Sequence, residues 1–82
     1  MMVSPEWYYE ENIKGKSTDQ IASIIRSLKR KIKQLETVVA NPKDYPQEWM
    51  ICPAPEVQLE MHRLYLQKAN VAVAIAIKRE EN

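Results

Sequence analysis

Two segments with helical periodicity are separated by a proline-rich connector, and this layout limits what the chain can fold into. In the first segment, apolar residues recur at alternating steps of 4 and 3, the spacing that lines up side chains on one helix face; they are Ile21, Ile25, Leu28, Ile32, Leu35 and Val39. The second pattern begins at Pro55 and includes Met61, Leu64, Tyr65, Ala69, Ala72, Ile75 and Ile77. The layout predicts an all-α chain built as a two-helix antiparallel hairpin with an N-terminal arm.

Local signals set the expected ends of each helix within a single domain. Ser17 to Gln20 match a capping box, in which the serine and glutamine side chains each bond the other residue's backbone. Asn41-Pro42 should end the first helix, because proline disfavours a helical residue before it. We therefore expect an arm at 1–16, helix one at about 18–40, a connector at 41–55 and helix two at about 56–79. The apolar connector is expected to pack as an ordered loop.

The arm should contain a short helix of its own. Ser4 is a residue type that caps helices, and Pro5 suits the first helical position.

The end of the second helix also fits a strand. Val71, Val73, Ile75 and Ile77 alternate with alanines, as in a strand with one face of small residues. Helix is favoured, because alanine is the best helix former and is depleted from strands.

The chain is too small to cover its own apolar surface. Two helices in contact bury one stripe each, and chains of this length rarely build a sufficient core alone. A helix that is apolar on all sides must be buried on more than one side. We therefore expect the hairpin to assemble into a homo-oligomeric helical bundle.

Composition excludes several classes of protein. The net charge of +1 makes a polymeric nucleic acid an unlikely partner. Cys52 is the only cysteine, so no intrachain disulfide can form and a cytoplasmic location is expected. No apolar run reaches the roughly 18 residues of a membrane span, and residues 1–7 do not resemble a secretion signal.

Four basic side chains form a stripe on helix one. Arg26, Lys29, Arg30 and Lys33 lie at helical spacing, and like charges at such positions repel by about 0.2–0.5 kcal/mol per pair. A phosphate-bearing ligand or an acidic protein face would compensate for this repulsion. Alternatively, the stripe is a solvated outer face.

A second cluster lies in the arm and combines rings, cations and a helix start. Its members are Tyr8, Tyr9, Lys14, Lys16 and Ser17. Rings stack on bases, while ammonium groups and free amide hydrogens bind phosphate, so the cluster suits a nucleotide. Alternatively, the rings fix the arm to the hairpin.

Helix two carries a polar row, Arg63, Gln67 and Asn70, inside a mostly apolar pattern. Arg63 is the best candidate for a phosphate contact, because its planar guanidinium binds oxygen pairs. The alternative is an ion pair across the hairpin. The lone His62 makes no metal site, and no catalytic motif or cofactor is indicated. We expect a protein without enzymatic activity.

Two short motifs resemble a known family. Asn12-Ile13-Lys14-Gly15 precedes the capped helix, and Arg63-Leu64-Tyr65-Leu66-Gln67 is followed by Ala69, Val71, Ala72 and Val73. These are similar to the small hairpin proteins that phages use as sponges against CBASS and Thoeris defence. The resemblance implies compact hexamers that sequester cyclic nucleotide signals without cleaving them, with Lys29 as the family's helix-one lysine. Lys16 stands where the family has a stacking tyrosine, so stacking would come from Tyr8 or Tyr9.

Two functions follow. The leading hypothesis is an oligomeric sponge for a cyclic oligonucleotide or cyclic ADP-ribose-type ligand, bound by Tyr8, Tyr9, Lys14, Lys16, Ser17, Arg26, Lys29 and Arg63. The alternative is a helical interaction module, a phage-encoded regulator or inhibitor that binds a host protein through its basic face.

Overall fold

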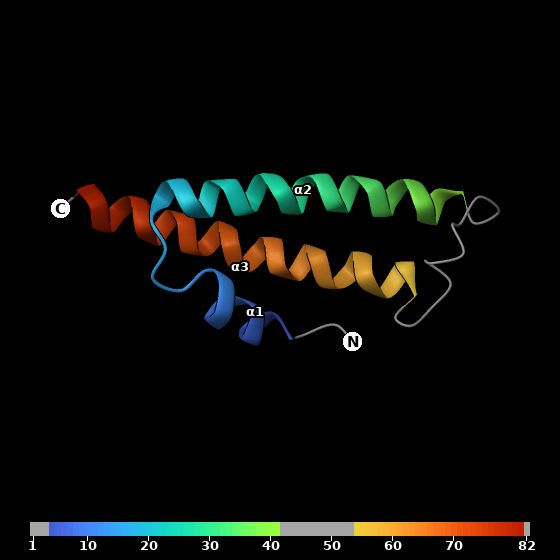
Figure 1. The fold of residues 1–82 in the computed structure, drawn as a ribbon, viewed down its shortest axis with the longest axis horizontal. Coiled ribbons are helices and arrows are strands. Elements are labelled where there is room, and N and C mark those ends of the chain that lie inside the picture. The colour runs from blue at the N-terminus through green and yellow to red at the C-terminus, as the bar shows by residue number, and fades with distance from the viewer. Residues whose placement is uncertain (1–3, 42–53, 82) are drawn as a thin grey trace.

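The computed structural model describes residues 4–41 and 54–81 of the chain. Its elements are α1 (Pro5–Asn12), α2 (Thr18–Ala40) and α3 (Pro55–Glu81), as Figure 1 shows. No strand occurs in these residues, so the all-α prediction is confirmed for the described part. Most of the connector expected at 41–55 lies outside the described residues.

The arm forms helix α1 followed by a tight turn. Ser4 caps the helix, since its hydroxyl oxygen accepts the Trp7 amide hydrogen at 3.2 Å. After α1, Ile13 is only 1% exposed and anchors the arm in the core. Gly15 then takes a φ of +78°, a left-handed conformation that glycine adopts without steric cost. The turn brings the chain to the start of α2.

The predicted capping box begins α2. The backbone amide of Gln20 donates to the Ser17 hydroxyl oxygen at 3.2 Å. In return, the backbone amide of Ser17 donates to the Gln20 side-chain oxygen at 2.9 Å. Two amide groups that a helix start would otherwise leave unpaired are thereby satisfied. The first helix is fixed by residues within its own first turn.

Helix α3 continues unbroken through residues 71–77, so this segment is helix and not strand. Its alanines are the reason that the helix packs closely on its neighbours. Ala69, Ala72 and Ala76 are buried, whereas Val71 and Ile75 point outward and are more than half exposed.

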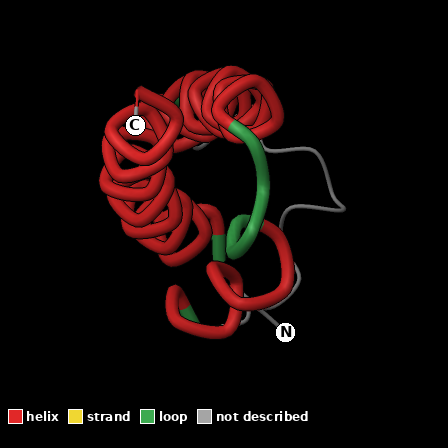
Figure 2. Tube along the Cα trace, turned by 90° about the vertical axis from the view of Figure 1, so that its left-hand side faces the viewer, coloured by secondary structure: helices red, strands yellow, loops and turns green. Residues whose placement is uncertain are grey.

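Helices α2 and α3 lie side by side and run in opposite directions, and α1 packs against α3 (Figure 1). Viewed nearly end-on, α2 and α1 approach α3 from different sides (Figure 2). The start of α2 is therefore next to the end of α3. Helix α1 lies beside the middle of α3, and the turn after it comes together with the first turn of α2 and the last turns of α3 (Figure 1).

The core forms two clusters along the contact of α2 and α3. The larger contains Ile13, Ile21, Leu28, Tyr65, Ala69, Ala72 and Ala76, and the smaller contains Ile32, Leu35 and Leu59. Of the α2 residues assigned to one seam by spacing, four are buried, while Ile25 and Val39 are half-buried against the clusters. The 4-and-3 spacing thus identified the face of α2 that packs.

Large apolar side chains on α3 remain uncovered in the single chain. Val57, Leu64, Val71, Ile75 and Ile77 are 48%, 37%, 61%, 59% and 45% exposed. Among residues 4–41 and 54–81, no helix has both the length and the apolar content needed to cross a bilayer.

Candidate functional site

A depression opens where α1, the turn after it, α2 and α3 meet. It is partly open to solvent, has a volume of about 40 Å³ and is lined by Tyr9, Ile13, Gly15, Lys16, Ile21, Ala72, Ile75, Ala76 and Arg79. Four of its apolar members are buried, namely Ile13, Ile21, Ala72 and Ala76. The charged members of this lining, Lys16 and Arg79, are both basic. An aromatic ring beside two cations suits a ligand that has a planar base and a phosphate.

The N-terminus of α2 borders this depression, and its donors are already bonded within the chain. The Glu80 carboxylate accepts the Thr18 amide hydrogen at 3.2 Å and the Thr18 hydroxyl hydrogen at 2.5 Å. These bonds stabilise the ionised form and hold the pKa of the Glu80 carboxyl below its usual 4.5. The backbone amide of Gln20 donates to the Ser17 hydroxyl, as described above. A carboxylate of the same chain therefore occupies the position that a ligand anion would take at this helix end.

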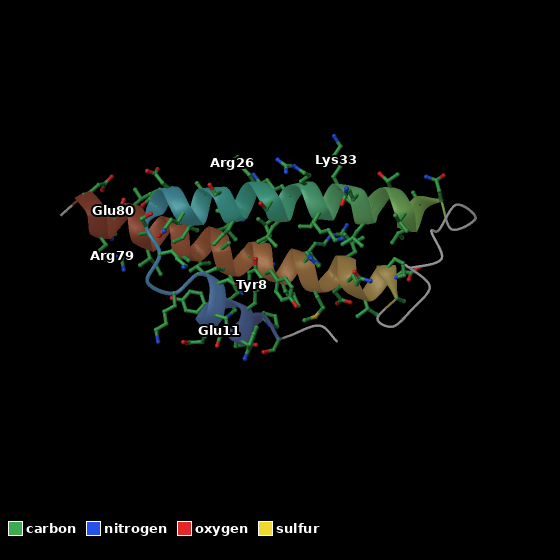
Figure 3. The ribbon with its side chains drawn as sticks, viewed as in Figure 1. Tyr8, Glu11, Arg26, Lys33, Arg79 and Glu80 are labelled. Atoms are coloured by element: carbon green, nitrogen blue, oxygen red, sulfur yellow. The ribbon has the colours of Figure 1, made fainter. Side chains whose placement is uncertain are left out.

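The two tyrosines of the arm have different environments. Tyr9 lines the depression, whereas Tyr8 stacks on Tyr65 of α3, with ring centroids 4.3 Å apart and planes inclined by 10°. Burial, together with the neighbouring Tyr65, raises the pKa of the Tyr8 phenol above 10.0. Figure 3 shows Tyr8 between α1 and α3. Both rings are partly buried against the core, but of the two only Tyr9 lines the depression, and Tyr8 packs the arm against α3.

Lys14 lies outside the lining of the depression. Its ammonium group is 3.2 Å from a Glu10 carboxylate oxygen, one turn back along the chain, and both side chains are exposed. Lys16, two residues later, is half-buried and does line the depression. Of the two arm lysines, the structure brings only Lys16 together with Tyr9.

The predicted basic stripe is a separate surface on α2. Arg26, Lys29, Arg30 and Lys33 are all exposed. Figure 3 shows Arg26 and Lys33 on the side of α2 that faces away from α3. Arg26 donates a hydrogen bond to the Ser23 hydroxyl at 3.0 Å. The stripe and the depression are thus two positively charged regions on different parts of the molecule.

Arg63 pairs with Glu36 across the long helices. The guanidinium Nη2 lies 3.2 Å from the Glu36 carboxylate, and the two side chains are 57% and 53% exposed. This is the structural role considered for Arg63 above. Arg63 is sixteen positions from Arg79, so the two lie about 24 Å apart along α3 at 1.5 Å per residue. Within one chain they cannot contact the same small ligand.

His62 has a local structural environment. Its Nδ1 donates to the Gln58 carbonyl oxygen at 2.7 Å, and its ring tilts against Tyr65 at 5.4 Å. Burial lowers the pKa of the imidazole below 6.5; the bond to Gln58 acts in the opposite direction, and the nearby Lys31 adds to the decrease. Among residues 4–41 and 54–81, no group of three His, Cys, Asp or Glu side chains is close enough to hold a metal ion.

Sequence reasoning did not select Arg79 as a ligand contact. The information was present, because an antiparallel arrangement places the last turn of α3 beside the first turn of α2 and hence beside Lys16. Comparison of the chain with protein-family models, with curated proteins and with solved structures finds no match. Function must therefore be argued from the residues themselves.

Proposed function

We propose that the chain is a non-enzymatic sponge that binds and sequesters a cyclic nucleotide immune signal, as a phage counter-defence protein in the cytoplasm of an infected host cell. The observation that carries the proposal is the depression that brings Tyr9, Lys16 and Arg79 together. The Tyr9 ring supplies a stacking surface for a base, and the two cations supply contacts for phosphate.

Assembly is part of the proposal. Arg63 and Lys29 do not line the depression of their own chain, and a depression of about 40 Å³ is too small to enclose a whole cyclic dinucleotide. A ligand that extends beyond one depression would reach residues of a second hairpin. The proposed active form is therefore a homo-oligomeric bundle of two-helix hairpins, with a hexamer as the resemblance implies.

A thermal-shift panel tests the binding. The unmodified protein is heated with cyclic dinucleotides, cyclic trinucleotides and cyclic ADP-ribose isomers, because a ligand at 100 times its Kd adds about 2.7 kcal/mol to the free energy of unfolding. At least one member of the panel should raise the melting temperature. The bound ligand should be recovered chemically intact, since a sponge forms and breaks no bond. If no nucleotide shifts the transition, the sponge proposal is wrong.

Matched variants locate the site. Lys16→Ala and Arg79→Ala each remove one cation from the depression, and losing a charge-assisted contact costs about 1.5–3 kcal/mol, or more than tenfold in affinity. Arg30→Ala removes an exposed cation from the stripe on α2 and serves as the control. Equal losses in all three variants would indicate attraction by overall charge rather than a site.

The second candidate function is a protein interaction module. It is favoured by the four exposed cations of the α2 stripe, which follow one another at helical spacing along one face. An acidic face of a host protein would satisfy this charge. The variants above separate the two functions, because loss of partner binding in Arg30→Ala but not in Lys16→Ala would identify the stripe as the working surface.

A further inference from the structure

Two hydrogen bonds join the last turn of α3 to the first residue of α2, and we name this pair of bonds the clasp. One oxygen of the Glu80 carboxylate accepts the Thr18 backbone amide hydrogen at 3.2 Å, and the other accepts the Thr18 hydroxyl hydrogen at 2.5 Å. Figure 3 shows Glu80 at the end of α3, beside the start of α2. Because each carboxylate oxygen has its own donor, the clasp fixes the orientation of the Glu80 side chain as well as its distance from α2.

The clasp lies beyond the apolar packing of α3. Ala76 is the last buried residue of this helix, and residues 77–81 are all exposed. The last four carbonyl groups of a helix have no partner within it, and helix ends fray. The position of the last turn of α3 therefore depends on polar contacts that it makes outside its own helix, and the clasp is such a contact.

Both cations of the depression are close to the clasp in sequence. Lys16 lies two residues before Thr18, and Arg79 immediately precedes Glu80. Lys16 belongs to a turn that has its own backbone bond, from the Lys16 amide to the Ile13 carbonyl oxygen at 3.1 Å, whereas Arg79 belongs to the exposed last turn of α3. Arg79 therefore stays beside Lys16 only while this last turn stays beside the start of α2.

We propose that Thr18 and Glu80 are positioning residues, whose clasp holds the last turn of α3 against the start of α2 and so keeps Arg79 beside Lys16 for a phosphate group. The inference rests on the proposed function only in assigning phosphate to the depression. A ligand that meets an ordered Arg79 does not have to order the helix end itself. Without the clasp, the apparent affinity falls with the fraction of molecules in which the last turn is in place.

Amide hydrogen exchange of the full chain, resolved by NMR, tests whether the clasp holds the two helix ends together. Each variant is made on one helix and measured on the other, so that the intrinsic exchange rate of the measured amides is unaffected. Thr18→Val removes the hydroxyl donor, and exchange at residues 79–81 should accelerate about two- to tenfold, the effect of losing one hydrogen bond. Thr18→Ser keeps the hydroxyl and should restore the slower rates. Exchange at the buried Ala69 and Ala72 checks that the fold is kept.

The reverse measurement uses two neighbouring carboxylates. Glu80→Ala removes both bonds of the clasp and should accelerate exchange at the Thr18 amide by about the same factor or more. Glu81→Ala removes the adjacent exposed carboxylate and should leave the Thr18 amide unchanged. Equal rates at Thr18 in these two variants, or unchanged rates at residues 79–81 in Thr18→Val, overturn the clasp.

Inorganic pyrophosphate tests the consequence for binding, in an NMR titration followed at Lys16 and Arg79. Thr18→Val keeps the net charge of the protein and should weaken pyrophosphate binding by up to the factor by which it accelerates exchange. Thr18→Ser should bind as the unmodified protein does. Unchanged affinity in a Thr18→Val protein with faster exchange would make the clasp a structural contact only and overturn the positioning role. Absence of pyrophosphate binding at these two residues of the unmodified protein would overturn it as well.

Failure of the nucleotide panel is a separate result. The exchange rates are measured without a ligand, and pyrophosphate has no base. If no nucleotide shifts the melting transition but Thr18→Val still weakens pyrophosphate binding, the clasp positions a phosphate site and only the nucleotide assignment is wrong.

Discussion

The ring of Tyr8 lies almost flat on the ring of Tyr65, with centroids 4.3 Å apart and planes inclined by 10°. Tyr65 is a core residue of α3 and is 3% exposed, so the stack fixes α1 to the buried centre of the molecule. The same contact holds Tyr9, the next residue, at the edge of the depression. Positioning of the candidate site thus depends on a ring that does not line it.

A double-mutant cycle measures this stack. Tyr8→Leu and Tyr65→Leu are combined, and the coupling free energy of unfolding is expected to be about 0.5–1.5 kcal/mol, the value typical of aromatic pairs. Denaturant unfolding followed by circular dichroism gives the four free energies. Trp7→Leu is the control, because Trp7 is exposed on the same helix and should combine with Tyr65→Leu additively. Additivity of the Tyr8 pair would show that the stack does not stabilise the arm.

Arg63 and Glu36 give the second prediction. Because both side chains are more than half exposed, Arg63→Ala should lower the free energy of unfolding by only about 0.2–1 kcal/mol. If Arg63 also contacts the ligand, its loss weakens nucleotide binding more than tenfold. Glu36→Ala breaks the same ion pair but keeps the cation, so it should leave affinity unchanged. A large fall in melting temperature with constant affinity would instead make Arg63 purely structural.

Acidification below pH 6.5 should destabilise the fold through His62. Its folded-state pKa is lowered, so below pH 6.5 the unfolded chain binds more protons there and stability falls as pH falls. His62→Gln lacks this group, so its free energy of unfolding should depend less on pH between pH 7 and 5. Denaturant titrations across this range compare the two proteins. Parallel pH profiles would contradict the prediction.

Gly15→Ala should destabilise the protein by about 1–2 kcal/mol, the cost of a left-handed conformation for a residue with a side chain. Nothing lies within 4 Å of the position that the new Cβ would take, so the cost is conformational rather than steric. Gly15→Asn is the matched variant and should lose less, because asparagine tolerates this conformation better. Similar losses for both would indicate that the turn's side-chain surroundings, not its φ, set the cost.

Features set by neighbours in sequence could be predicted. The capping box at Ser17 depends on atoms three residues apart, and the seam of α2 depends on a repeat that a single helix displays. The bonds at the end of α3, which spans Pro55–Glu81, show the contrast. Glu80 makes its bonds to Thr18, 62 positions away, so that contact has no local signature.

The candidate site was harder to predict for the same reason. Residue types marked Tyr8, Tyr9, Lys16 and Arg63 as chemically suitable. Which of them share a surface depends on tertiary partners that spacing does not reveal: Tyr65 for Tyr8, Glu36 for Arg63 and Arg79 for Lys16.

The bonds between Thr18 and Glu80 also bear on the order in which the chain folds. Closing a loop of this length costs entropy that grows with the logarithm of its length, and two exposed hydrogen bonds do not offset that cost alone. The contact can persist only once the apolar seam between α2 and α3 has formed. It should therefore be among the last contacts made in folding and the first lost in local opening. Amide hydrogen exchange at Thr18 would then report whether the start of α2 and the end of α3 are joined.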